Sequence, residues 1–303
     1  MNLCVIGTGY VGLVTGSCFA HKGHTVVCVD KDAEKIRVLN DGGMPIYEPG
    51  LEDIVKACRK DGRLRFVTDI ASAELIKHAS NSFLATKISF INAVAVVCEL
   101  SGADVQLVAQ GMGLDPRIGS RFLSAGIGYG GSCFPKDVSA FEQIARELGF
   151  DFGMLREVQK VNREMRERFL RKVEEELWIV KGKIFGVWGL AFKPDTDDIR
   201  EAPAIELIQR LVEKGAIVKA HDPQAMKKAQ KAIPALTCCA TAEEAAQGVD
   251  ALLVCTEWPV FRDFPLAKLK GLLKHPLVLD GRNLYDPAAM KAAGFDYRCV
   301  GRG

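Results

Sequence analysis

The sequence predicts an α/β protein in which two domains with parallel sheets are joined by a long helical region. Apolar runs of strand length alternate with helical segments near both ends of the 303-residue chain. These runs are apolar throughout, as buried parallel strands are. Helical periodicity replaces the strands in the middle of the chain. We therefore expect three regions, over residues 1–70, 71–180 and 181–303.

The first region alternates strands and helices from its first residues. A short apolar run ends at a glycine turn, and a second run closes at Asp30. We expect strands over residues 3–6, 25–29 and 64–67, and helices over residues 10–21, 32–39 and 51–60. Only three strands precede the central helical region, so the first sheet should be small.

The second region has no convincing strand between residues 72 and 112. Apolar residues such as Leu84, Ile88 and Ile91 recur at helical spacing, which predicts one long helix or two joined helices. Pro116 forbids simple continuation of this segment. A second long helix is expected over about residues 152–180.

The alternation of strands and helices resumes in the third region. Apolar runs of strand length again end at polar or charged residues, and one helical segment lies between the first two runs. We expect strands over residues 183–188, 216–220, 237–239, 251–255 and 277–279, and a helix over residues 202–214.

Composition narrows the class of protein. The formal net charge is +2, with charges of both signs interspersed, so neither nucleic-acid binding nor an acidic tail is indicated. The ten cysteines are scattered, mostly in apolar runs, and form no CxxC pair, which argues against structural zinc or any other metal site. We expect a reducing, cytoplasmic setting. No uncharged run approaches transmembrane length, so no membrane contact is expected.

The first motif is a glycine turn between a strand and a helix, with the sequence Gly7-Thr8-Gly9-Tyr10-Val11-Gly12. The glycines permit the tight turn, the approach of a pyrophosphate and close helix packing. Asp30 ends the next strand, where a carboxylate can accept hydrogen bonds from a ribose and repel a 2′-phosphate. NAD is therefore favoured over NADP, although Lys31 weakens this preference. The alternative is a plain turn with an aspartate that caps the next helix.

The second motif surrounds Cys133 in a polar, glycine-rich loop, Gly130-Gly131-Ser132-Cys133-Phe134-Pro135-Lys136-Asp137. A nearby cation and a following helix start both favour a thiolate. A thiolate can attack an aldehyde to give a thiohemiacetal, which can lose hydride to give a thioester. A structural cysteine in a turn is an equally weighted alternative.

Two further patterns carry candidate binding groups. Lys77 and Asn81 share one face of a predicted helix and could stabilise an oxyanion, although a solvated polar face explains such a pair better. Lys193 and Arg200 follow a predicted strand, where each could meet a phosphate, and Arg282 lies at a similar strand end. The alternative for this pattern is a charged surface loop.

Together the motifs resemble the UDP-glucose 6-dehydrogenase branch of the nucleotide-sugar dehydrogenase family. Six segments across nearly the whole chain carry the resemblance. They are the glycine turn, residues 45–51 (PIYEPGL), residues 81–92 (NSFLATKISFIN), the cysteine loop, residues 191–196 (AFKPDT) and residues 255–258 (CTEW).

The resemblance implies an NAD-dependent, two-step oxidation of UDP-glucose to UDP-glucuronate by a homodimer or higher homo-oligomer with two Rossmann-like domains. Cys133 would be the nucleophile, Asp137 would help to activate water, and Lys77 and Asn81 would stabilise the oxyanion. The NAD contacts would be Gly7, Gly9, Val11, Gly12, Asp30, Lys35, Lys136 and Arg200. The substrate contacts would be Lys77, Arg117, Phe122, Leu123, Ser124, Ala125, Gly126, Gly130, Lys193 and Arg282.

The chain departs from this family after its third strand. The family has roughly 130 residues there, which complete the first sheet and carry a glutamate for proton transfer, and none of their motifs occurs here. We expect a truncated first domain and weak or absent turnover. The alternatives are a UDP-sugar-binding module without catalysis and a dehydrogenase of another sugar nucleotide such as GDP-mannose. A further alternative, that the block exists in the native protein, would be opposed by an intact mass near the 33.0 kDa of this sequence.

Overall fold

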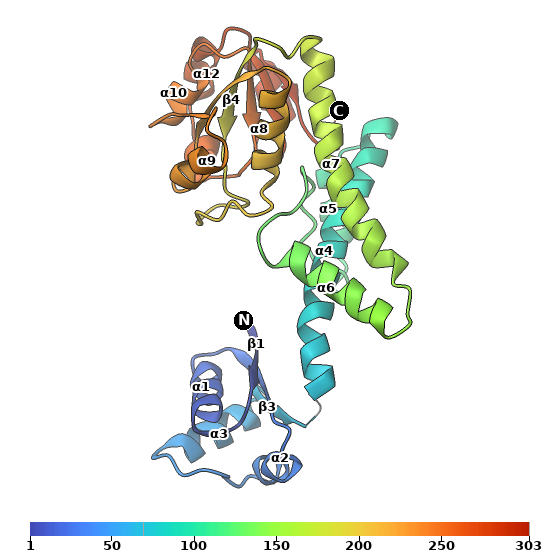
Figure 1. The fold of residues 1–303 in the computed structure, drawn as a ribbon, viewed down its shortest axis with the longest axis vertical. Coiled ribbons are helices and arrows are strands. Elements are labelled where there is room, and N and C mark those ends of the chain that lie inside the picture. The colour runs from blue at the N-terminus through green and yellow to red at the C-terminus, as the bar shows by residue number, and fades with distance from the viewer. Residues whose placement is uncertain (69, 303) are drawn as a thin grey trace. The chain divides into compact units, whose positions relative to one another are not determined.

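The computed structural model describes residues 1–68 and 70–302, without the side chains of residues 70–74. The chain forms two compact units, Met1–Ser80 and Asn81–Gly303, which are described separately (Figure 1). The expected α/β class with parallel sheets is confirmed in both units.

The first unit is a three-stranded parallel sheet with strand order β1-β2-β3. Its strands lie within a residue of their predicted bounds, and its helices likewise. The strands are β1 (Asn2–Ile6), β2 (Thr25–Val29) and β3 (Leu64–Val67), and the helices are α1 (Tyr10–His21), α2 (Ala33–Asn40) and α3 (Leu51–Lys60). Leu13, Val26 and Phe66 lie in the buried core between sheet and helices. This three-stranded order corresponds to one half of the six-stranded sheet of a doubly wound fold.

Two joined helices follow, as one of the two alternatives predicted. They are α4 (Ile70–Ser101) and α5 (Val105–Gly113), and Asp104 caps the second by accepting a bond from Gln106 N–H at 2.7 Å. One segment among the described residues, Leu75–Ser101, is long and apolar enough to cross a membrane by length and composition. Core helices of soluble proteins have the same character, and a third of its most apolar stretch is buried.

Two more helices complete the helical part of the second unit. They are α6 (Phe134–Glu147), which begins directly after Cys133, and α7 (Gly153–Leu177). Pro135 at the start of α6 fits the fixed backbone angle of a first turn. The buried side chains of α7, among them Met165 and Phe169, join the core of the second sheet.

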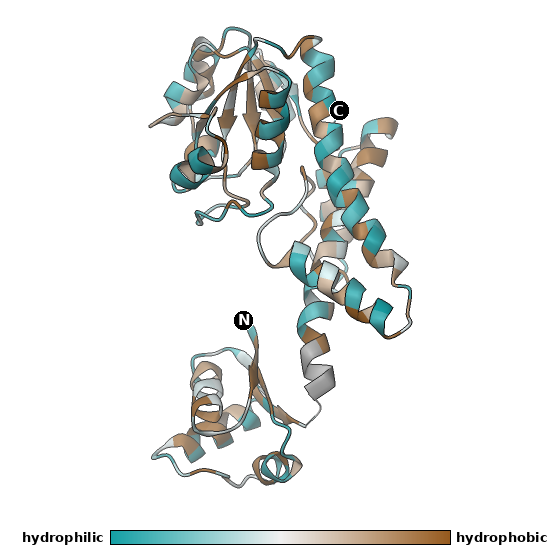
Figure 2. Ribbon diagram, in the orientation of Figure 1, coloured by the Kyte–Doolittle hydropathy of each residue, from teal (hydrophilic) through white to brown (hydrophobic). Residues whose placement is uncertain are grey.

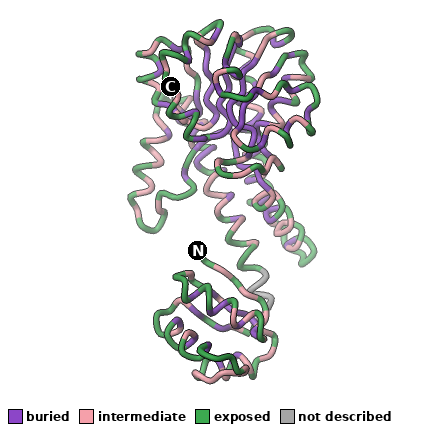
Figure 3. The backbone as a smooth tube through the Cα atoms, turned by 90° about the vertical axis from the view of Figure 1, so that its left-hand side faces the viewer, coloured by how far each residue is buried: buried purple, intermediate pink, exposed green. Residues whose placement is uncertain are grey.

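The second sheet has six parallel strands in the order β6-β5-β4-β7-β8-β9. Its apolar, buried strands appear in Figures 2 and 3. They are β4 (Ile184–Trp188), β5 (Ile217–His221), β6 (Thr237–Cys238), β7 (Ala251–Val254), β8 (Leu277–Asp280) and β9 (Asp296–Arg298). The helices between them are α8 (Pro203–Glu213), α9 (Met226–Ala232), α10 (Ala242–Ala246), α11 (Pro259–Arg262), α12 (Leu266–Leu272) and α13 (Pro287–Ala292). The strand order reverses between β4 and β7, which places a binding crevice at their carboxyl ends.

Candidate active site

A pocket of about 320 Å³ lies at the carboxyl ends of β4, β7 and β8, where the strand order predicts a crevice. It gathers side chains from α4, from the segment before α6 and from the loops after the three strands. Six of the residues predicted to hold the substrate line it or a part of its wall, namely Phe122, Ser124, Gly126, Gly130, Lys193 and Arg282. The structure thus brings together residues separated by up to 160 positions in sequence.

Arg282 connects the segments that form this pocket. Its Nε atom donates to Cys255 O at 2.8 Å, and its two Nη atoms donate to Gly128 O and Phe192 O at 3.2 Å. Its Nε atom also lies 3.4 Å from a carboxylate oxygen of Glu257. Because one guanidinium bonds three chain segments, Arg282 stabilises the pocket wall as well as lining it.

Glycines allow these segments to approach closely. A Cβ atom on Gly126 would lie 2.7 Å from Gly281 O, and one on Gly130 would overlap the carbonyl of Glu201. The contacts involve backbone atoms, which cannot move aside as the end of a flexible side chain can. The two predicted binding glycines are therefore explained by close packing of the pocket walls.

We expect the substitution Gly130→Ala to lower both thermal stability and affinity for the pocket's ligand, because the backbone around Glu201 must shift. Overpacking of this kind costs about 1–3 kcal/mol. Gly271→Ala is the matched control, since a Cβ atom there meets nothing within 4 Å in helix α12. Differential scanning calorimetry checks the result, and equal melting temperatures for the two variants would contradict it.

The cysteine loop delivers Cys133 to the start of α6. Its thiol is exposed and lies 3.9 Å from Ser132 Oγ. One helical turn later, buried Asp137 donates its backbone N–H to Cys133 O at 2.8 Å. Asn81 of α4 donates to a carboxylate oxygen of Asp137 at 2.5 Å, and Lys136 Nζ lies 3.8 Å from the other. The structure thus places three of the four predicted catalytic residues around one helix start.

Other predicted residues lie elsewhere. Lys77 lies one turn before Asn81 on α4. Leu123 and Ala125 are buried and line a neighbouring cavity of about 390 Å³. The side chain of Arg117 is 88% exposed and pairs with Asp115 at 2.6 Å. Arg117 lines neither of these two cavities.

The glycine turn of the first unit has the geometry expected of a phosphate-binding turn. Gly7 has a φ of +96°, and a Cβ atom on Gly12 would overlap the carbonyl of Gly7. Among the described residues, no side chain caps the N-terminus of α1, and Val11 in its first turn is largely exposed. The helix start can therefore receive a phosphate, which fits the adenosine half of a dinucleotide. A three-stranded sheet supplies only this half of the site.

Asp30 at the end of β2 is held beside this turn. One carboxylate oxygen accepts bonds from the backbone N–H and the hydroxyl of Thr8, both at 2.7 Å, and the other accepts from Asp32 N–H at 3.0 Å. Lys35 pairs with Asp32 at 3.8 Å. Burial alone would raise the pKa of Asp30, but these hydrogen bonds outweigh it and lower the pKa to about 2.

We expect Asp30 to make the stability of the protein pH-dependent. Because its folded pKa lies below the unfolded value of about 3.9, its contribution is present above that pH and is lost as the pH falls toward 2. When the pH is lowered from about 3.9 to about 2, the Asp30→Asn variant should therefore lose less unfolding free energy than the native chain. The free energy of unfolding of both proteins, obtained from urea titrations followed by circular dichroism at several pH values, checks this prediction. The same dependence on pH in both proteins would contradict the assignment.

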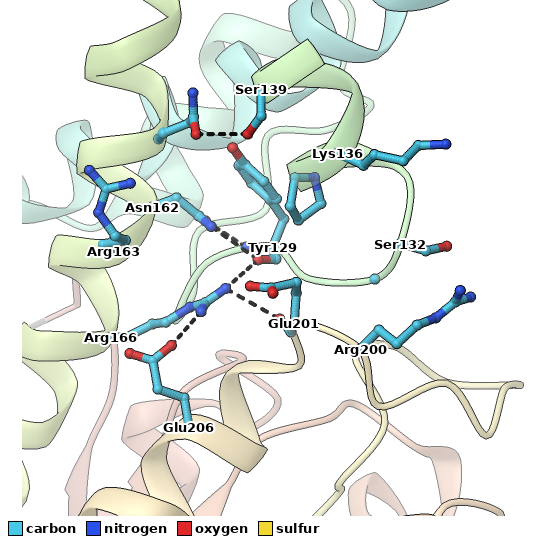
Figure 4. A pocket seen from close by; sticks show the side chains of 13 residues that line it. Tyr129, Ser132, Lys136, Ser139, Asn162, Arg163, Arg166, Arg200, Glu201 and Glu206 are labelled. Carbon is cyan, nitrogen blue, oxygen red and sulfur yellow. Dashed lines mark hydrogen bonds and ion pairs between the residues drawn. The ribbon is translucent and has the colours of Figure 1, made fainter.

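Several residues that shape the site could not be predicted from the sequence motifs. Asn92 of α4 accepts a bond from Gly126 N–H at 2.9 Å, and Asn162 of α7 bonds both backbone groups of Tyr129, at 2.8 and 3.1 Å (Figure 4). Both amides are buried and hold the substrate segment against the two long helices. A polar residue on the apolar face of a predicted helix is the signal that could have indicated them.

Three models of one family match the chain in succession. The NAD binding domain of the UDP-glucose/GDP-mannose dehydrogenase family matches residues 1–87, its central domain matches residues 71–164, and its UDP binding domain matches residues 186–287. The prediction of an NAD-binding domain is confirmed by the first of these matches.

Relatives named as UDP-glucose 6-dehydrogenases are similar over the whole chain. The UDP-glucose 6-dehydrogenase YwqF of Bacillus subtilis is 36% identical over 430 aligned positions, which cover 100% of this chain and 98% of the relative. The UDP-glucose 6-dehydrogenase of Pseudomonas aeruginosa is 34% identical, with the same two coverages. A solved UDP-glucose dehydrogenase from Pyrobaculum islandicum has a TM-score of 0.72 and 26% identity, and the match covers 100% of this chain and 98% of that one.

The alignment with YwqF also measures what this chain lacks. It has 430 positions against 303 residues here, so 127 positions (430 minus 303) have no counterpart in this chain. Both chains are covered almost to their ends, so the shortfall is internal. An internal shortfall agrees with the structure, in which α4 follows β3 directly after only three strands of the first unit.

Three domain models match in succession, and the similarity to YwqF extends over the whole chain. The chain therefore belongs to the UDP-glucose/GDP-mannose dehydrogenase family.

Proposed function

We propose that this chain binds UDP-glucose in its second unit and carries the cysteine chemistry of an NAD-dependent oxidation to UDP-glucuronate, with turnover reduced by its shortened first sheet. One observation carries the proposal. The pocket at the ends of β4, β7 and β8 adjoins the loop of Cys133, in a chain similar throughout to UDP-glucose 6-dehydrogenases. Bound NAD would accept hydride in each of two oxidations.

The residues around Cys133 support this chemistry. The exposed thiol can add to the aldehyde carbon formed from the sugar alcohol, and loss of hydride from this adduct leaves a thioester that water hydrolyses. Asp137 is positioned by Asn81 and by its place one turn after Cys133, which suits it to orient that water. Lys77 and the amide of Asn81 would stabilise the oxyanion of the adduct.

The shortened first sheet is the reason to expect impaired turnover. A dinucleotide binds across the crevice between the two halves of a doubly wound sheet, and one half is present in the described first unit. The nicotinamide would lose its support. The family's proton-transfer glutamate would also be missing, and general acid–base catalysis contributes about 10²–10⁴-fold in rate.

Titration calorimetry of UDP-glucose into the full chain tests the binding part of the proposal. We expect one site per chain and a weaker affinity for Lys193→Gln, since Lys193 lines the pocket and makes a cation–π contact with Phe192 but no ion pair among the described residues. Tighter binding of GDP-mannose would support the alternative substrate instead. Absence of binding to either sugar nucleotide would contradict the proposal.

We further propose a homodimer formed through α4, in a cytoplasmic setting suited to ten free thiols. Phe83, Phe90 and Val97 are exposed and recur every seven residues, so they form one apolar stripe along the helix. This α4 stripe carries no charge and can pack against the same stripe of a second copy.

We expect the substitution Phe90→Lys to convert the dimer into a monomer, because it places a charge at the centre of the stripe. Leu148→Lys, at an exposed apolar position after α6, is the control and should remain dimeric. Sedimentation velocity distinguishes the two species. A dimer that persists in Phe90→Lys would exclude this stripe as the interface.

A further inference from the structure

The sheet of the first unit has two edges, β1 on one side and β3 on the other. The edge at β3 is protected. Arg65 is exposed within this strand, and the side-chain amide of Asn40 donates to Phe66 O at 3.3 Å. A charged side chain and a covering group are two of the devices by which proteins prevent one sheet edge from pairing with another.

The edge at β1 has neither device. The strand Asn2–Ile6 contains no charged residue and no proline. Gly7 N–H donates to Val29 O at 2.6 Å, so the odd-numbered backbone groups of this strand face β2. Backbone groups alternate between the two sides of a strand, and β1 has no neighbour on its other side among the described residues. The N–H and C=O groups that point outward there belong to Asn2, Cys4 and Ile6.

The side chains of β1 leave one face of the strand uncovered. Leu3 and Val5 are partly buried against the core of the first unit. Cys4 lies on the opposite face and is exposed, and Ile6 on that face is 68% exposed. In a doubly wound sheet the first strand is an inner strand that pairs with the second half of the sheet. Because that half has no counterpart here, β1 has the sequence of an inner strand at the position of an edge.

The edges of the second sheet offer no matching strand. β6 has only the two residues Thr237–Cys238, and β9 carries the charged residues Asp296 and Arg298. Within the described part of the chain, β1 is therefore the one edge strand that is uncharged, uncovered and longer than two residues. A second copy of the chain presents the same edge, and identical uncharged strands related by a two-fold axis meet without repulsion.

We propose that β1 pairs with β1 of a second copy in antiparallel orientation, which joins two three-stranded sheets into one sheet of six strands. A two-fold axis at Cys4 places this residue opposite Cys4 of the second copy, and places Asn2 opposite Ile6. The outward backbone groups of each such pair then exchange two hydrogen bonds. This contact depends on no nucleotide and is separate from the α4 stripe, so it joins α4 dimers into larger assemblies.

Crosslinking of the purified native chain with a short bis-maleimide, followed by mass spectrometry of the joined peptides, tests this contact. The two Cα atoms of a hydrogen-bonded antiparallel pair are about 5.5 Å apart, so Cys4 should be joined to Cys4 of the second copy. If the purified chain gave no such product, the edge would be open to a different polypeptide and the proposal would be overturned.

The substitution Ile6→Lys should lower the yield of this product at least about ten-fold, because an edge lysine blocks strand pairing. Tyr47→Lys is the matched control, since Tyr47 is an 84% exposed apolar residue of the same unit outside the sheet, and it should crosslink like the native chain. In sedimentation velocity, the native chain should form species larger than the α4 dimer as its concentration rises, whereas Ile6→Lys should remain a dimer. An equal yield in Ile6→Lys and the native chain would overturn the proposal.

Amide hydrogen exchange of the native chain decides the question even if Ile6→Lys fails to fold. The N–H groups of Cys4 and Ile6 should exchange more slowly as the protein concentration rises, whereas those of Leu3 and Val5, which face β2, should not change. Exchange at Cys4 that is independent of concentration would overturn the proposal. UDP-glucose is absent from these measurements, so their failure would leave the proposed function standing.

Discussion

Replacing Cys133 with serine is expected to remove NADH formation from UDP-glucose, on the order of 10³-fold or more, and to leave UDP-glucose affinity within about two-fold. The physical reason is that a serine hydroxyl at this exposed helix start is far less nucleophilic than a thiolate. The substitution changes one atom, and among the described residues the sulfur of Cys133 makes no hydrogen bond with the backbone. NADH absorbance and calorimetry on the same preparation measure the two effects.

A labelling experiment keeps this prediction testable even where native turnover is small. Iodoacetamide should modify Cys133, and saturating UDP-glucose should slow that reaction if the thiol faces the bound sugar. Cys4 and Cys18 are the other exposed thiols of the described chain and serve as internal controls, resolved by mass spectrometry. Unchanged NADH production by Cys133→Ser, or equal protection of all three thiols, would contradict the assigned role.

The substitution Asp222→Ala is expected to cost about 3–5 kcal/mol of unfolding free energy and to abolish UDP-glucose binding. Asp222 is fully buried after β5. Its carboxylate accepts backbone bonds from Leu190 and Ala191 at 2.7 and 3.1 Å, and a bond from Trp258 Nε1 at 3.1 Å. It also caps the chain at Gln224 and Ala225, at 2.9 and 2.8 Å. Without it, the loops after β4 and β7 lose their common anchor.

Urea unfolding and calorimetry of Asp222→Ala measure these effects. Asp263→Ala is the control, because the carboxylate of Asp263 is exposed and pairs with Arg262 at the surface. We expect its stability to change by less than about 0.5 kcal/mol. If Asp222→Ala unfolded at the same urea concentration as this control, the hydrogen bonds at the strand ends would not determine the pocket's stability.

The fold was predictable because the strands are local signals. β2 and β7 are continuous apolar runs, and each stops at a turn or polar residue, so pattern alone fixed their bounds to within a residue. The glycine turn was equally local, since its three glycines and strand–helix context lie within twelve residues. β9 was missed because its three residues, Asp296–Arg298, are polar or aromatic and pair only at the sheet edge.

The site was predictable only in part. Cys133 and Asp137 are neighbours in sequence, so their proximity follows from one helical turn. The bonds of Arg282 and of Asn92 join segments that are far apart in the chain, and no periodicity encodes them.

The proposed function is tested most directly by the rate of NADH formation by the full chain with saturating UDP-glucose and NAD, measured beside the Bacillus subtilis relative. We expect this chain to bind UDP-glucose and to turn it over about 10²–10⁴-fold more slowly than that relative, since the described first unit provides half of a cofactor sheet. Turnover equal to that of the relative, and dependent on Cys133, would contradict it and would require a complete cofactor site that a three-stranded sheet does not provide.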